Sequence, residues 1–276
     1  MRVEIKSRFS GAVLFAAETE SMRLAVELAV KARANLARAN LAGAYLARAN
    51  LAGADLAGAN LAGVDLTGAN LTGAYLAGVD LAGAYLTGAD LARANLADAK
   101  LADANLAGAD LARANLADAN LARAYLARAH LAGAYLAGAN LAGANLARAY
   151  LAGAHLADAN LAGADLARAH LADAKLRAKG GLDLVLVGER PCLQIGPIGS
   201  RHDHMAAFIT DAGVYVRAGC FWDTLDAFRR AVAETHGDNA HAQEYAAAIT
   251  LIEAHARLWA PGTTTSATAE TAEAQA

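Results

Sequence analysis

Ala-Asn-Leu-Ala-Arg, residues 34 to 38, begins a five-residue unit that then continues without a break. Leu occupies every fifth position from Leu36 to Leu176, twenty-nine times in all. Ala stands two residues before each Leu, except at Val64 and Val79. The residue just before Leu is usually Asn, Asp, Tyr, His or Lys. The five-residue period of this stretch determines which folds the chain can adopt.

A period of five fits neither a helix nor a flat strand. Ala and Leu favour helices, but five residues at about 100° each advance about 500°, so successive Leu side chains would circle the helix. In a straight strand the odd spacing would place successive Leu on opposite faces. A coil that turns a corner after each unit points every Leu at one axis. We therefore predict a mainly β fold with four units in each coil and about seven coils over 34–178.

The core of this coil is predicted to be a column of Leu side chains with small Ala side chains beside it. Glycine or other small residues at the fifth position of the unit suit a tight corner. Core positions spread along the block are Leu36, Leu56, Leu76, Leu101, Leu121, Leu141 and Leu161.

The units, as in 34–38 and in Ala-Asp-Leu-Ala-Gly at 54–58, resemble the A-(D/N)-L-X-X signature of pentapeptide-repeat proteins. The resemblance covers about half of the chain. It implies a right-handed quadrilateral β-helix. Some members of that family resemble a DNA duplex in width and charge and act on DNA gyrase, so the resemblance also implies one functional hypothesis.

The segment before the repeats, 1–33, is predicted to be a hairpin and a helix. Apolar residues flank Ser10-Gly11 in a hairpin pattern, and an amphipathic helix is expected from Glu20 to Arg33. A stacked coil exposes unpaired amides at its first layer, so solenoids need covered ends. The segment is interpreted as an N-terminal cap, and a partner-binding helix is the alternative.

The segment after the repeats, 182–259, is predicted to be a small α+β module. Short strands are expected at 184–187 and 192–195, and a hairpin from strands 205–210 and 214–217. Asp223 or Thr224 is expected to cap one helix to about His236, and Asn239 a second to about Trp259. The remaining residues, 260–276, have the composition of a disordered tail.

Outward side chains of such a coil stack at intervals of twenty residues, which selects two groups as candidate binding residues. Arg128, Arg148 and Arg168 fall in one corner column. They form either a solvated face with Asp counterions or an anion-binding stripe, because like charges one layer apart repel. The second group lies within 51–92, which has no basic residue, and consists of Asp55, Asp65, Asp80 and Asp90.

The residues that best suggest catalysis lie in the C-terminal module. His-x-His in 201–204 places two imidazoles on one side of a strand and can begin a metal site, with His236 and His241 as further candidates. A structural zinc site needs four protein ligands, however, and this pattern supplies two. Cys220 lies between Gly219 and aromatic residues, which favours packing over nucleophilic catalysis. We predict no catalytic residue, no metal and no cofactor.

Net charge and cysteine content indicate which partners and which cellular compartment to expect. The 276 residues carry a formal charge of −3, which shows no bias toward nucleic acid or membranes. Cys192 and Cys220 both lie outside the repeats; reduced thiols are the simpler interpretation, and a disulfide stays open. The N-terminus has no signal-peptide pattern. We expect a cytoplasmic protein of bacterial or phage origin.

Three functional hypotheses remain. The first is a non-enzymatic scaffold whose regular surface binds an unknown protein partner, with homo-oligomerisation through the C-terminal module. The second is a DNA mimic that acts on gyrase or a related topoisomerase; this requires an extended negative surface, whereas the repeats are neutral overall. The third is a small enzyme or metal-binding activity in the C-terminal module. Neither membrane association nor direct nucleic-acid binding is expected.

Overall fold

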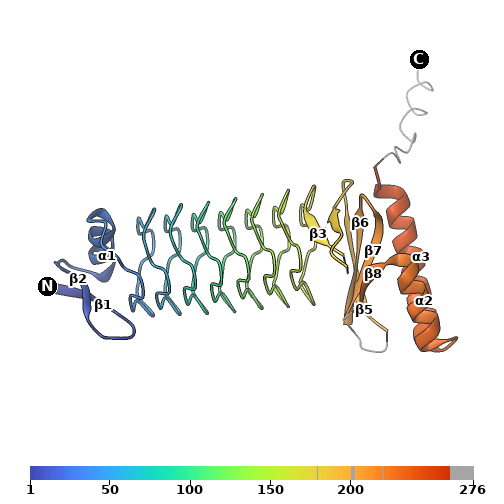
Figure 1. Ribbon diagram of the computed structural model, residues 1–276, viewed down its shortest axis with the longest axis horizontal. Coiled ribbons are helices and arrows are strands. Elements are labelled where there is room, and N and C mark those ends of the chain that lie inside the picture. The colour runs from blue at the N-terminus through green and yellow to red at the C-terminus, as the bar shows by residue number, and fades with distance from the viewer. Residues whose placement is uncertain (179, 200–202, 220, 262–276) are drawn as a thin grey trace, which may run out of the picture. The chain divides into compact units, whose positions relative to one another are not determined.

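The computed structural model describes residues 1–178, 180–199, 203–219 and 221–261. It divides into two compact units, Met1–Arg177 and Ala178–Ala276. The first contains the five-residue repeats and the second contains the residues that follow them (Figure 1). Most of the segment predicted as a tail, 262–276, lies outside the described residues.

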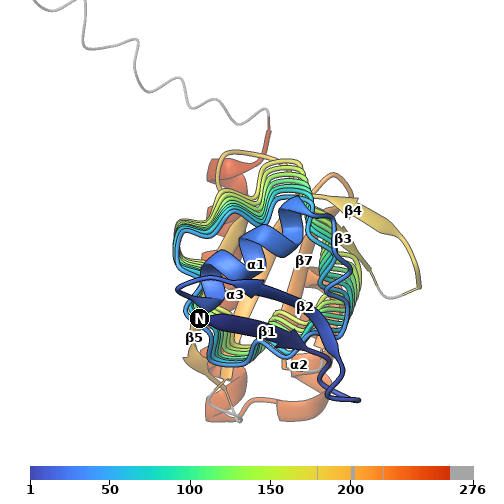
Figure 2. The same ribbon diagram turned by 90° about the vertical axis from the view of Figure 1, so that its left-hand side faces the viewer.

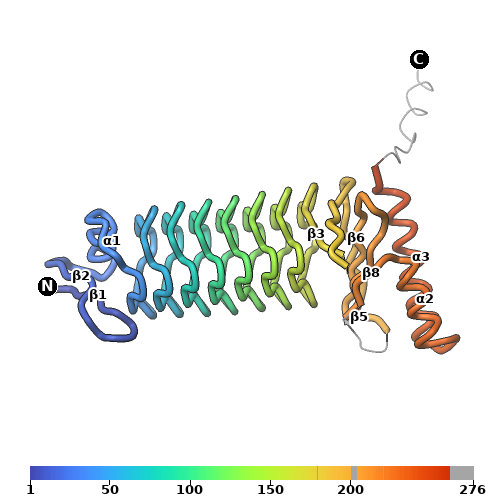
Figure 3. Tube along the Cα trace, in the orientation of Figure 1, coloured from blue at the N-terminus to red at the C-terminus, as the bar shows by residue number. Residues whose placement is uncertain are grey.

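The repeat block is a β-helix whose turns bridge to one another in parallel. The bridges join residues twenty positions apart, from Asn40↔Asn60 to His155↔Lys175. Twenty residues correspond to four five-residue units. Two backbone N–H groups per unit donate to the following turn, as in Leu61 to the Asp80 carbonyl at 2.7 Å. The Cα trace in Figure 3 shows these turns following one another at an even pitch.

Each unit bends through a β-turn. The N–H of Ala39 donates to the carbonyl of Leu36 at 3.0 Å, and the same bond recurs in the later units. The corner residue has positive φ throughout, from 61° at Arg38 to 57° at Asp173. Small corner residues were expected, and Gly does occupy many corners. Arg and Asp nevertheless adopt this backbone elsewhere, because hydrogen bonds to the neighbouring turns fix the chain on both sides of the corner.

The leucine column fills the inside of the helix. Seen along its axis in Figure 2, the turns superpose around one interior. Leu161 is 8% exposed and Leu76 is 1% exposed. The remaining positions named from the sequence are fully buried: Leu36, Leu56, Leu101, Leu121 and Leu141.

The N-terminal segment forms an antiparallel hairpin and a short helix. Strands β1 (Arg2–Lys6) and β2 (Val13–Glu18) pair with each other. Helix α1 (Met22–Lys31) begins after Ser21, whose Oγ accepts from the N–H of Leu24 at 3.3 Å. Ser is a favoured residue at this position because it satisfies one of the free amides at a helix start.

The hairpin and α1 supply hydrogen-bond partners to the first turn of the β-helix. Asn40 and Asn50 belong to that turn and have no preceding turn to receive their N–H groups. The N–H of Asn40 donates to the carbonyl of Lys6 at 2.7 Å, and that of Asn50 to Glu27 Oε1 at 2.9 Å. Figure 2 shows α1 lying across this end of the helix. These contacts remove exposed edge amides.

Four antiparallel strands form the sheet of the second unit, in the order β5-β6-β7-β8. Their bounds are β5 (Cys192–Ile198), β6 (Asp203–Thr210), β7 (Gly213–Ala218) and β8 (Phe221–Thr224). Two three-residue strands precede them in sequence, β3 (Lys175–Arg177) at the end of the first unit and β4 (Asp183–Val185). Strand β5 extends beyond the predicted 192–195, and β8 was not predicted.

Two helices cover one face of this sheet. Helix α2 (Leu225–His236) begins after Thr224, and α3 (Ala240–Trp259) after Asn239; each cap side chain accepts a backbone N–H. Their core consists of residues from β6, β7 and both helices, including Met205, Val216, Phe228 and Ile252. In the part of the chain that the structure describes, no helix has the length and apolar character needed to cross a membrane.

Candidate functional site

The outward side chains of the β-helix form straight columns. The residue before each Leu stacks on its equivalent twenty positions away, because the bridges pair these positions. Asn side chains in such columns bond to one another: Asn60 Nδ2 donates to Asn40 Oδ1 at 3.1 Å, and Asn160 to Asn140 at 3.2 Å. Outward residues of the repeat block that are separated by a multiple of twenty therefore lie in one surface column.

The four candidate aspartates do not come together. Asp55, Asp65, Asp80 and Asp90 lie in four different columns, as their bridge partners show. Each carboxylate instead accepts the backbone N–H two residues later, at 3.0 to 3.2 Å. These side chains stabilise the turn at their own corner. They do not form a continuous acidic strip.

The three candidate arginines do come together. Arg128, Arg148 and Arg168 occupy the same corner of successive turns, with φ between 57° and 60°. Together with Tyr150 and His170 they line an open groove of about 360 Å³. Among the residues described, none forms an ion pair or hydrogen bond with these three guanidinium groups. The groove is therefore rich in unneutralised positive charge.

An aromatic ladder runs beside the arginines. The His130 and Tyr150 rings have centroids 4.6 Å apart, and the Tyr150 and His170 rings lie 4.8 Å apart and nearly parallel, at 3°. Tyr150 lies between the two histidine rings, so a ring faces it on each side and its polar edge remains for a ligand.

A neighbouring corner shows how charge is neutralised elsewhere. Arg123 binds Asp103 with two hydrogen bonds of 2.7 Å. The hydrogen bond from Arg123 lowers the pKa of the Asp103 carboxyl, and the same bond raises the pKa of Arg123. A guanidinium on this surface can thus pair with a carboxylate at the same corner of the adjacent turn. The column of Arg128 offers none.

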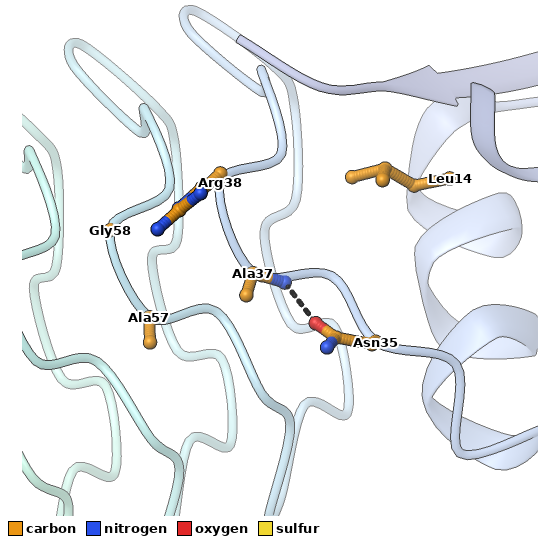
Figure 4. Close-up of a pocket in the computed structure, with 6 residues that line it drawn as sticks. All are labelled: Leu14, Asn35, Ala37, Arg38, Ala57 and Gly58. Atoms are coloured by element: carbon orange, nitrogen blue, oxygen red, sulfur yellow. Dashed lines mark hydrogen bonds between the residues drawn. The ribbon is translucent and has the colours of Figure 1, made fainter. Parts of the chain in front are cut away.

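A second hollow lies near the start of the β-helix and was not foreseen from the sequence. Its volume is about 670 Å³, and Figure 4 shows Arg38 reaching toward Gly58 while Leu14 lies on the other side. Its remaining polar side chain, Asn35, accepts the N–H of Ala37 at 2.8 Å. Because Asn35 is already bonded, the hollow presents one cation and little else that could orient a ligand.

The catalytic-looking cluster of the C-terminal module is only partly described. Arg201, His202 and Cys220 lie outside the described residues. His236 and His241 are neighbours, with ring centroids 5.8 Å apart. Within the described ranges, no three His, Cys, Asp or Glu side chains gather closely enough to hold a metal ion.

Exposed tyrosines form a column that was not among the residues selected from the sequence. Tyr45, Tyr85 and Tyr125 share one face of the β-helix, on every second turn. They are 82%, 56% and 57% exposed. A Tyr at intervals of forty residues, twice the coil period, is the sequence signal that identifies this column.

Comparison with known families and structures identifies the repeats. The family model described as Pentapeptide repeats (8 copies) matches residues 34–73, 74–113, 114–150 and 144–178, which together span just over half of the chain. No curated protein matches the chain.

Several solved structures are similar to the repeat block. HetL, a pentapeptide repeat protein involved in heterocyst differentiation regulation from the cyanobacterium Nostoc sp. strain PCC 7120, is 34% identical over 51% of this chain and 82% of its own, with a TM-score of 0.25. A protein from the Arabidopsis thaliana thylakoid lumen is 32% identical over 34% of this chain and 68% of its own, with a TM-score of 0.30.

One structure of QnrB1, a plasmid-mediated fluoroquinolone resistance protein, is 22% identical over 42% of this chain and 64% of its own, with a TM-score of 0.27. All three TM-scores are below one half.

Proposed function

The chain belongs to the pentapeptide-repeat family, and from this premise we propose that it is a non-enzymatic scaffold whose β-helix presents a regular surface to a protein partner. In this proposal the helix is quadrilateral, with about seven turns. The N-terminal hairpin and α1 cap its first turn.

The observation that carries this proposal is the column of Tyr45, Tyr85 and Tyr125. Tyr is enriched in protein interfaces and in their energetic hot spots, because it combines a large apolar ring with a polar end. Its side chain also loses little conformational entropy on binding. Here the three rings are held at fixed intervals by a backbone that is hydrogen-bonded to the turns on either side. Such preorganisation lowers the cost of association.

A matched capture experiment tests the column. The full chain, the Y45A/Y85A/Y125A variant and the control Y75A/Y135A are each used to capture proteins from the source cells. The control removes exposed Tyr side chains from a different column. We expect one captured protein to be lost with the triple variant and retained with the control. Identical capture by all three proteins would contradict the proposal.

Action on DNA gyrase is the second candidate function. A DNA mimic needs a continuous negative surface. The candidate aspartates lie in four columns and serve as turn caps, which argues against such a surface. We expect no effect of the full chain in a gyrase supercoiling assay. Inhibition of gyrase, or protection of gyrase from an inhibitor, at micromolar concentrations of the protein would instead favour this function over the scaffold.

Homo-oligomerisation through the C-terminal unit is proposed on a separate observation. Leu251 and Leu258, seven residues apart on α3, are 50% and 56% exposed. Positions seven apart lie on nearly the same helix face. Light scattering of the full chain is expected to give a mass above the monomer that falls to the monomer in L251E/L258E. The control Q243E, at another exposed α3 position, should keep the larger mass.

A metal-dependent activity of the C-terminal unit is the third candidate function and has the least support. Metal analysis of the purified full chain is expected to find no stoichiometric metal. Bound metal that is lost on His204→Ala would instead favour this activity.

A further inference from the structure

We propose that the groove lined by Arg128, Arg148 and Arg168 binds a linear phosphate chain, either a free inorganic oligophosphate or the phosphate arm of a nucleotide. This site is distinct from the Tyr column and does not depend on a protein partner.

Positive charge exceeds negative charge along this corner of the β-helix. Three guanidinium groups occupy one corner on successive turns, and like charges on adjacent layers repel. Of the residues three positions before these arginines, only Asp165 is acidic; Tyr125 and Asn145 precede the other two. A bound anion would relieve the repulsion, and Arg pairs with phosphate oxygens through two parallel hydrogen bonds.

The two aromatic residues that line the groove offer polar groups and not open ring faces. Tyr150 and His170 offer polar ring edges, while their faces lie on each other at 4.8 Å. A nucleobase therefore has no free ring face between them on which to stack. The groove recognises oxygen-rich negative charge, which favours a phosphate chain over a base.

The length of the arginine column favours a chain over a single ion. Adjacent layers of a sheet are about 4.8 Å apart, so the three corners span about 10 Å. A single phosphate ion is too short to bridge all three guanidinium groups. An extended acidic peptide places same-side carboxylates about 6.6 Å apart, which falls out of register with the layers. A phosphate chain carries charge on every link and rotates freely, so it can follow the column.

A second Arg pair on the same β-helix provides the comparison. Arg93 and Arg113 are also corner residues of successive turns, with φ of 59° and 57°. The residue three positions before each of them is an aspartate, Asp90 or Asp110. Each arginine of this pair therefore has a carboxylate three residues before it, whereas only one of Arg128, Arg148 and Arg168 does, so no phosphate chain is expected at the pair.

Glycine substitution removes charge while preserving the corner. Gly68, Gly88 and Gly108 occupy the same column as Arg128 with φ of 63° to 64°. Glycine adopts this backbone without the steric cost that Arg incurs. The variants R148G/R168G and R93G/R113G therefore remove equal charge from equivalent corners, and circular dichroism checks that both remain folded.

Titration calorimetry of the full chain at about 0.15 M salt tests the proposal with inorganic tripolyphosphate as the probe, since low salt would exaggerate surface attraction. We expect one site per chain, with affinity reduced roughly tenfold or more in R148G/R168G. The control R93G/R113G should change the affinity by less than about twofold. Equal losses in both variants, or no binding to the wild type, would overturn the proposal.

Three further titrants distinguish the ligands. Orthophosphate should bind at least about tenfold more weakly than tripolyphosphate, because it reaches fewer guanidinium groups. If ATP binds as strongly as tripolyphosphate, the ligand is assigned as the phosphate arm of a nucleotide. If ATP binds more weakly, the ligand is assigned as a free inorganic oligophosphate. A glutamate-rich peptide that binds more tightly than tripolyphosphate would refute the assignment to phosphate.

Discussion

Arg123 donates from its Nε and one Nη to the two carboxylate oxygens of Asp103, both at 2.7 Å, across one turn of the β-helix. The two residues lie twenty positions apart, so the coil period itself creates the pair. This hydrogen bond lowers the pKa of Asp103. A lowered carboxyl pKa contributes stability above the unfolded-state pKa and loses it as the pH falls through the folded-state pKa.

We predict that Arg123→Gly raises the pKa of Asp103 toward its ordinary value. Carboxyl carbon chemical shifts followed by NMR during an acid titration measure this change directly. Arg113→Gly, at a corner of another column, is the control and should leave the Asp103 titration where it was. An unchanged Asp103 pKa in Arg123→Gly would mean that the pair does not persist in solution.

The leucine column makes the interior intolerant of charge. Leu101 is fully buried, so Leu101→Asp would place a carboxylate where no partner can reach it, and we predict loss of the folded repeat unit. Leu101→Ala should cost about 2–5 kcal/mol. Leu101→Met, which keeps the volume, should cost less than about 1.5 kcal/mol. Denaturant unfolding gives all three values, and wild-type melting of Leu101→Asp would refute the inward column.

The unpaired Arg column should destabilise the free protein slightly. Arg148→Gly removes the middle charge, and we expect the thermal midpoint at low salt to rise by roughly 1–2 °C, the size of a surface charge effect. In about 1 M salt the difference should shrink, because the Debye length falls to about 3 Å. Arg123→Gly relieves the same positive-φ corner but breaks an ion pair, so its midpoint at low salt should rise less than that of Arg148→Gly, and this gap should narrow in about 1 M salt. Scanning calorimetry at both salt concentrations measures the two midpoints.

The thiol of Cys192 should react slowly in the folded protein, although the residue is partly exposed. Burial raises the pKa of its thiol to about 12, so at pH 8 only about one thiol in ten thousand is the nucleophilic thiolate. A free thiol has a pKa of about 8.5. The thiol therefore favours the folded state below about pH 8.5, and its contribution is lost as the pH rises toward about 12.

Alkylation measures this protection. In a Cys220→Ala background Cys192 is the single cysteine. Its reaction with iodoacetamide at pH 8 should be at least about a hundredfold slower in the folded protein than in denaturant, because the thiolate population limits the rate. Similar rates in both states would show that the Cys192 thiol is accessible and normally ionised.

Sequence alone predicted much of the second unit's secondary structure. Thr224 and Asn239 cap the helices as expected, since a polar side chain before an apolar periodic run is a local signal. Strand β8 was missed because Phe221–Thr224 is only four residues long and leads directly into α2. So short a segment has no periodicity of its own, and it becomes a strand by pairing with β7.

The repeat period alone determined the leucine column and which outward residues share a column. Each follows from counting, because a regular coil fixes every position relative to the next. The tertiary structure decided how those columns behave: Asp55 and its three counterparts became turn caps, Arg123 found Asp103, and Arg128, Arg148 and Arg168 did not find a carboxylate. The spacing of twenty residues places Asp103 beside Arg123, but whether a carboxylate bonds to a guanidinium or to a backbone amide depends on side-chain direction and on the amides that the fold brings within reach.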